Sequence, residues 1–264
     1  MRIGISFGFI ALVLSSYFLN LLTFLNDMLE ECFQFLNGIG AKKERLLNKQ
    51  NIRTWDDFLR VRTLSGISTQ RKAHYDRLLQ LARKALLQQD AGYFARLPQR
   101  EMWRLYPHFK KNCCFLDIEA DTKAIIVLTL FDRFESTTFV RGVHLEKDVI
   151  QKELDKHKLV ITYNGSAFDI VHLKRLGIVV TQPHIDLKPL CERLGLAGGL
   201  KAIETTVGIQ RPAHLRGSAT DAWKAFWASG DREYLELLIA YNEQDAVSLY
   251  QLMEWCQKRL KTFK

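Results

Sequence analysis

Short apolar runs in the second half of the chain alternate with segments of helical periodicity. Runs rich in β-branched and aromatic residues predict four strands, at 113–118, 124–131, 136–140 and 159–163. Apolar positions three and four residues apart predict helices at about 146–157 and from 234 to the end of the chain. This order of elements is typical of an α/β domain, which we place at 113–264, with helices flanking a mixed sheet.

The first half has a different pattern. Helical periodicity interrupted by glycine turns runs through residues 28–97 and predicts a small all-α domain, whose last helix we expect at 74–97. Leu97-Pro98-Gln99 interrupts that helix, so we place a linker at 98–112. Residues 1–112 contain 18 Lys and Arg against 9 Asp and Glu, whereas 113–264 contain 20 of each. The net charge of +9 therefore belongs to the first part, which predicts that it contacts a phosphate backbone.

The first 27 residues form a separate apolar segment. From Ile3 to Asn26 there is no charged residue, and about 20 apolar residues suffice to span a bilayer. Three interpretations stay open: a membrane anchor through residues 3–25, a secretory signal, or an upstream extension from a misassigned start. We favour the extension, because Met28 begins the helical pattern at once and five cysteines without a disulfide framework indicate a cytoplasmic protein. A membrane is expected as a partner only if residues 1–27 are genuine.

Acidic residues stand at the edges of buried elements in three segments. Asp117 and Glu119 occupy alternate positions of one strand, so both side chains project from the same face. Asp169 follows a strand and a Gly-Ser turn and lies at or near a helix start, while Tyr241 and Asp245 share one face of the last helix. Carboxylates gathered in this way repel one another and are costly to desolvate, so divalent cations are their natural compensation.

Each of these acidic patterns is common by itself. Their order along the chain and their positions on strand, turn and helix together indicate a functional site. Asp117-x-Glu119, then Tyr-Asn-x-x-x-Phe-Asp169, then Tyr241-x-x-x-Asp245 resemble the three exonuclease motifs of the ribonuclease-H-like DEDD superfamily. From about residue 113 to 256 the chain is most similar to the YprB-type group of exonucleases, including His184-Ile-Asp-Leu and Gly199-Leu-Lys-Ala-Ile-Glu. The resemblance implies a ribonuclease-H-like fold and hydrolysis of nucleic acid from a 3′ end with two Mg²⁺ or Mn²⁺ ions. A tyrosine at position 241 in place of a histidine implies the tyrosine-bearing subclass.

The residue chemistry agrees with a two-ion site. Asp117 is our candidate for the ligand shared by both ions, Glu119 and Asp245 complete the shell of the ion that activates water, and Asp169 holds the other. Oxygen ligands suit magnesium or manganese, and no Cys/His cluster has zinc spacing. Tyr241 is expected to orient the attacking water by a hydrogen bond.

Other residues of this half carry weaker signals. Asn164 is a candidate contact to nucleic acid or a simple turn residue, and Phe168 contacts a terminal base or belongs to the core. Asp186 supports the site or caps a helix. The glycines at 195–199 lack the context of a nucleotide-binding loop, and no Ser/His/Asp set is evident.

Two glycine turns in the basic half resemble helix-hairpin-helix elements. Each opens a helix, and glycine lets the backbone approach a phosphate while free helix amides and nearby cations bind it. The candidate contacts are Gly38, Gly40, Lys42 and Lys43 in the first turn, with Arg45 beyond, and Gly66, Arg71 and Lys72 in the second. Between the turns, Thr54-x-x-Asp57 predicts a capped helix start, with Trp55 and Phe58 in the core. A small helical domain with glycine turns and no such role is the alternative.

The residue chemistry and the resemblance together predict a metal-dependent 3′-to-5′ exonuclease that binds single-stranded or 3′-ended nucleic acid. We favour DNA over RNA, although the residues that sense a 2′-hydroxyl depend on pocket geometry. Two alternatives stay open. One is a nucleic-acid-binding module without turnover, and the other is a structure-specific endonuclease or ribonuclease.

Overall fold

The chain folds into two compact units. The structure, a computed structural model, describes residues 28–121, 124–215 and 219–262, so the apolar segment 1–27 lies outside the described residues. Within the described residues, the first unit comprises 28–89 with 96–98, and the second comprises 90–95 with the described residues from 99 onward. No helix in the described part of the chain is both long and apolar enough to cross a bilayer.

The first unit is helical. It contains α2 (Ala41–Lys49), α3 (Trp55–Arg60) and α4 (Thr69–Leu87). The predicted start of α3 is confirmed, because Thr54 and Asp57 form a reciprocal capping box. Trp55, Phe58 and Tyr75 are buried in its core, and the Tyr75 hydroxyl donates to the Asn37 carbonyl at 2.8 Å. The last helix was predicted at 74–97, but α4 begins five residues earlier, at Thr69, and ends ten residues earlier, at Leu87.

Residues 98–112 differ from the expected linker. They form three short helical turns of the second unit, η2 (Gln99–Leu105), α5 (Tyr106–Phe109) and η3 (Lys110–Asn112). Most of the large apolar side chains here are buried, and the Tyr106 hydroxyl donates to Glu254 at 2.7 Å. Pro98 does not end the long helix, since α4 ends eleven residues earlier, and the aromatic residues that follow the proline need a core. A further short turn, η1 (Ala91–Phe94), precedes them.

A five-stranded mixed sheet forms the centre of the second unit and confirms the predicted fold class. Its strands are β1 (Cys113–Ala120), β2 (Ile125–Phe131), β3 (Ser136–Val140), β4 (Leu159–Thr162) and β5 (His184–Asp186), in the order β3-β2-β1-β4-β5. The pairs β1–β2 and β2–β3 are antiparallel, whereas β1–β4 and β4–β5 are parallel. The sequence predicted four of these strands and missed β5, because a strand of three residues is too short to show an apolar pattern.

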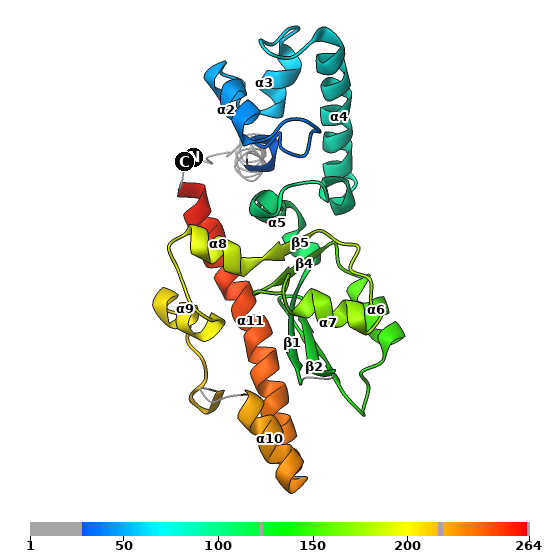
Figure 1. The fold of residues 1–264 in the computed structure, drawn as a ribbon, viewed down its shortest axis with the longest axis vertical. Coiled ribbons are helices and arrows are strands. Elements are labelled where there is room, and N and C mark those ends of the chain that lie inside the picture. The colour runs from blue at the N-terminus through cyan, green and yellow to red at the C-terminus, as the bar shows by residue number, and fades with distance from the viewer. Residues whose placement is uncertain (1–27, 122–123, 216–218, 263–264) are drawn as a thin grey trace, which may run out of the picture. The chain divides into compact units, whose positions relative to one another are not determined.

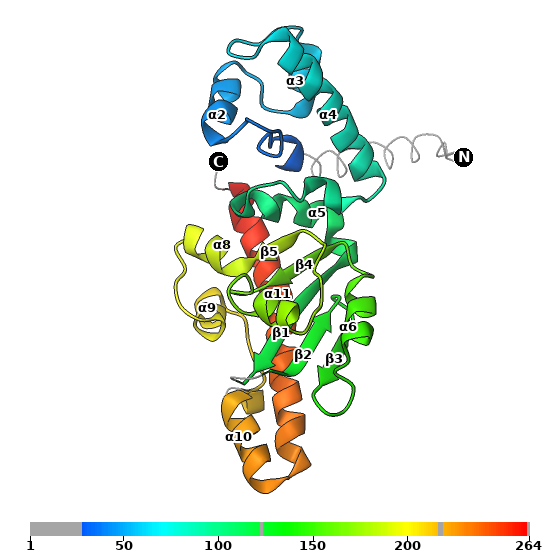
Figure 2. The same ribbon diagram turned by 45° about the vertical axis from the view of Figure 1, so that its right-hand side comes forward.

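Helices cover both faces of this sheet (Figures 1 and 2). On one face, α6 (Lys147–Leu154) and α7 (Asp169–Arg175) pack over an apolar layer that includes Leu116 and Ile118 of β1. On the other face lies α11 (Arg232–Thr262), which follows α10 (Ala219–Ser229). The remaining helices are α8 (Leu187–Arg193), α9 (Leu200–Val207) and η4 (Ala213–Leu215). Because side chains alternate along a strand, Asp117 and Glu119 face α11.

Candidate metal centre

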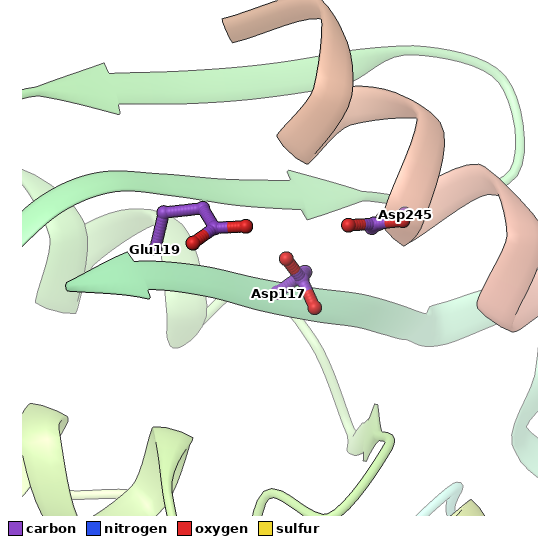
Figure 3. A group of neighbouring side chains, drawn as sticks. All are labelled: Asp117, Glu119 and Asp245. Carbon is purple, nitrogen blue, oxygen red and sulfur yellow. The ribbon is translucent and has the colours of Figure 1, made fainter. Parts of the chain in front are cut away.

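Three acidic side chains meet between β1 and α11. Asp117, Glu119 and Asp245 each offer one carboxylate oxygen, and these oxygens all lie within 4.8 Å of one another. Figure 3 shows the two side chains of β1 pointing toward Asp245 on the helix. A register shift between Glu119 and Ala120 ends the regular pairing of β1 with β2 beside the acids. The strand and helix predicted from sequence thus place residues 128 positions apart at one site.

Asn242 holds the central acid in place. Its Nδ2 atom donates to Asp117 Oδ2 at 2.6 Å, and the Asn242 side chain is fully buried. Sequence reasoning missed this residue. The sequence nevertheless contained a signal for Asn242. Residues three apart on a helix share a face, as residues four apart do, and Asn242 lies three residues before Asp245.

Asp169, the fourth acid, begins α7 and is 3 % exposed. Its Oδ1 atom is buried and has no hydrogen-bond partner among the residues that the structure describes. An unpartnered buried carboxylate oxygen is costly, and a bound cation is a common way to satisfy it. Asp169 thus fits the expected ligand role, although it lies outside the group of three oxygens defined above.

The turn before Asp169 is fixed by Asp186. One oxygen of Asp186 accepts the backbone N–H of Asn164 at 2.8 Å and the other accepts that of Ser166 at 3.0 Å. Asp186 also caps α8 by accepting the Lys188 N–H at 3.1 Å. Both roles considered for Asp186 are therefore present, and the support for the site acts through the backbone of the turn.

A cavity of about 500 Å³ opens beside the acids. Its walls include Asp117, Asn164, Phe168, Asp169, Lys188 and Gly199. Phe168 is 38 % exposed, which differs from a core position, and the Asn164 side-chain oxygen accepts from Lys188 Nζ at 3.3 Å. Pockets for small ligands commonly measure about 300 to 1,000 Å³, so a nucleotide-sized group fits here.

The acids of this site hold their protons more tightly than usual. Burial raises the pKa of Asp117 well above its usual range, and the carboxylates of Asp245, Asp169 and Glu119 raise it further. Burial and Asp245 raise the pKa of Glu119 to about 7. Burial, together with Asp186 and Glu119, raises the pKa of Asp169 to about 8 against two backbone hydrogen bonds that lower it. A cluster of this kind favours divalent cations bound through oxygen.

Without divalent cations, the free energy of unfolding is expected to fall as the pH rises from about 4 to about 8. An aspartate in the unfolded chain ionises near 3.8 and Asp169 in the folded chain near 8, so the folded state binds more protons throughout this window. The raised pKa of Glu119 acts in the same direction. Urea unfolding with a chelator at several pH values measures the trend, and Asp169→Asn should flatten it. Stability that rises across the window would contradict the expectation.

Comparison with known protein families agrees with the fold and the acids. The sequence model of the RNase_H superfamily matches residues 114–257, which is more than half of the chain. The chain belongs to the RNase_H superfamily. No match was found among curated proteins. An RNase_H domain with an acidic cluster supports a nuclease-type role, with divalent metal and nucleic acid as the expected partners.

Tyr241 of the RNase_H domain directs its hydroxyl to a backbone carbonyl. It is 4 % exposed, and its hydroxyl donates to the His214 carbonyl at 3.3 Å. Lys201 Nζ lies 5.3 Å from the centre of its ring. The role of Tyr241 in orienting water stays a prediction, because its oxygen can still accept a hydrogen bond from a water while its O–H donates to His214.

The basic unit exposes most, but not all, of the residues predicted to contact nucleic acid. Gly38 and Gly66 have φ values of +82° and +79° in exposed turns, which favours glycine at both positions. Gly40 precedes α2 without a side-chain cap, and Lys42 on α2 and Arg71 on α4 are exposed, whereas Lys43 is partly buried.

Lys72 is a correction to the expected contacts. It is only 3 % exposed, its Nζ binds Asp76 at 2.7 Å, and it lies 4.8 Å from the centre of the Phe58 ring. Its charge is therefore paired with Asp76 inside the unit, and Lys72 does not contribute to a surface for nucleic acid.

Proposed function

We propose that this protein is a metal-dependent 3′-to-5′ exonuclease of the DEDD type, in the tyrosine-bearing subclass and similar to the YprB group. The observation that carries the proposal is the convergence of Asp117, Glu119 and Asp245 beside a cavity that also contains Asp169. An acidic site that opens onto a nucleotide-sized cavity suits a chain end better than the middle of a duplex.

The proposed roles follow from position. Asp117 is central to the acids and serves as the shared ligand, with Glu119 and Asp245 on one side and Asp169 on the other. Two bound Mg²⁺ or Mn²⁺ ions would polarise the scissile phosphate and lower the pKa of an attacking water. Asn242 keeps Asp117 oriented through its 2.6 Å hydrogen bond.

The cavity wall accounts for the remaining contacts to a 3′-terminal nucleotide. The exposed ring of Phe168 stacks on the terminal base, an interaction that tolerates any base. Asn164 and Lys188 lie together on the same wall and meet the sugar-phosphate backbone. Because these contacts are not specific to one base, we expect little sequence preference.

The test uses 5′-labelled single-stranded DNA and RNA of equal sequence with Mn²⁺ or Mg²⁺, and a chelator control. A ladder that shortens from the 3′ end and disappears with the chelator supports the proposal. Cleavage of a circular single strand would instead indicate an endonuclease. Binding without cleavage of either polymer would indicate a non-catalytic module, an alternative consistent with the ion pair between Asp245 and Arg211.

The basic unit is proposed to hold the phosphate backbone through α2. Replacing both Lys42 and Arg45 with alanine is expected to reduce the slope of log binding constant against log salt concentration by about 2, since each lost phosphate contact lowers it by about 1. Lys49→Ala, an exposed lysine at the other end of α2, is the matched control. Equal slopes for the double variant and the control would refute this role.

A further inference from the structure

Arg211 joins a buried glutamate to an acid of the candidate metal centre. Its Nε and Nη2 atoms both donate to the Glu204 carboxylate, the latter at 2.6 Å, and Nη2 also donates to Asp245 Oδ1. The side chains of Arg211 and Glu204 are 7 % and 2 % exposed, and that of Asp245 is 13 % exposed. The two-point contact with Glu204 fixes the plane of the guanidinium, so the direction of its bond to Asp245 is fixed as well.

The local chain path explains how the two residues meet. Glu204 lies on α9, and Gly208 ends that helix in the left-handed conformation with φ +82°. The Ile209 N–H then returns to the Glu204 carbonyl at 2.9 Å. The chain therefore doubles back at the end of α9 and carries Arg211 to the Glu204 side chain. In the sequence, Glu204 was noted only as the last residue of Gly199-Leu-Lys-Ala-Ile-Glu204, without a role, and Arg211 was not noted.

Stability alone does not account for this arrangement. Burying two charges costs desolvation free energy that offsets much of their attraction. Apolar residues of similar size often stabilise a core equally well. Moreover, Arg211 Nη1 is buried and has no hydrogen-bond partner among the described residues, an added cost that a purely structural pair need not bear. What the pair achieves is an orientation for Asp245, one of whose oxygens is directed at Asp117 and Glu119 (Figure 3).

We propose that Arg211, anchored by Glu204, is a positioning residue that holds the Asp245 carboxylate ready to bind a divalent cation. Arg211 uses one oxygen of Asp245, which leaves the other for the cation. The inference rests on the proposed function for its metal site, and it adds two residues that act through Asp245 and touch neither the nucleic acid nor the cation.

Binding of Mn²⁺ alone tests the inference on the full chain, by electron paramagnetic resonance or calorimetry. Arg211→Lys keeps the charge but lacks the planar fork, and it is expected to weaken Mn²⁺ binding by about 10- to 100-fold, as loss of a residue that orients a metal ligand commonly does. Glu204→Gln keeps the shape of the anchor and should weaken binding in the same direction, but less. Arg104→Lys alters a different partly buried ion pair of the second unit, with Glu101, and should leave Mn²⁺ binding unchanged.

Kinetics provide a second readout. The Mn²⁺ concentration that gives half-maximal cleavage should rise by the same factor in Arg211→Lys, while the KM for the DNA strand stays that of the wild type. If Arg211→Lys fails to fold by circular dichroism, Glu204→Gln carries the test.

The outcomes separate this inference from the proposed function. Folded variants that bind Mn²⁺ as tightly as the wild type, or more tightly, would overturn it, because Arg211 would then be a structural residue or a competitor of the cation. A wild type that binds no Mn²⁺ would overturn it too. If the variants bind Mn²⁺ more weakly but the wild type cleaves nothing, the positioning role is supported and the exonuclease is rejected. If the wild type cleaves from the 3′ end but both variants bind Mn²⁺ as the wild type does, the exonuclease is supported and the positioning role is rejected.

Discussion

Asp117→Asn is expected to lower metal-dependent cleavage by about 10³-fold or more. Metal ions contribute several kcal/mol to the stabilisation of a phosphoryl transition state, and each 1.4 kcal/mol corresponds to a factor of about ten. Asparagine keeps the size of the side chain and can still accept the hydrogen bond from Asn242, so the loss would come from the missing charge. Initial rates of shortening of a 5′-labelled strand at saturating Mn²⁺ measure the effect.

The same substitution is expected to stabilise the protein in the absence of metal. The Asp117 carboxylate is desolvated and faces three further acids, which is why its pKa lies well above the usual range. Removing that acid relieves repulsion, so the chelated variant should unfold at a higher temperature than the chelated wild type. Glu135→Gln, at an exposed turn, is the control and should change neither rate nor stability. A variant that loses activity and stability together would indicate a structural role for Asp117.

The position of the acids on β1 followed from sequence, because alternation along a strand leaves few choices. Leu116 and Ile118 had to face a core, and this put Asp117 and Glu119 on the opposite face. The helical pattern of α11 did not determine which of its residues contacts the acids of β1. Tyr241 and Asn242 lie four and three residues before Asp245, so helical spacing allowed either to hydrogen-bond to an acid on β1, and in the folded protein Asn242 does so.

Contacts that depend on a turn could not be predicted in the same way. Arg211 reaches Glu204 because of the left-handed backbone at Gly208, and many glycines have no such function. Lys72 illustrates a different error. A basic residue in the first turn of a helix looked like a phosphate contact, but Asp76 lies four residues later on the same face and binds it.

Gly165→Ala is expected to destabilise the fold by about 1 to 3 kcal/mol and to lower cleavage by about 10²-fold. A Cβ atom at position 165 would stand 2.0 Å from Thr162 Oγ1 and 2.5 Å from its Cβ, and Thr162 is fully buried at the end of β4. The turn must therefore shift, at the cost typical of an overpacked core. Asp169 follows this turn directly, and a displacement of about 1 Å at a reacting centre can cost about 10²-fold in rate.

Gly199→Ala is the matched control, because Gly199 lines the same cavity, has a negative φ and would place its Cβ in open space. Stability in urea should be near wild type in this control and reduced in Gly165→Ala, and Mn²⁺-dependent cleavage should be reduced in Gly165→Ala relative to the wild type. Adding Thr162→Gly to Gly165→Ala removes the atoms that clash, so it should restore part of the cleavage rate even though a buried side chain is lost. If Gly165→Ala matched its control in stability and the wild type in cleavage, the close approach of the turn to β4 would not be what positions Asp169.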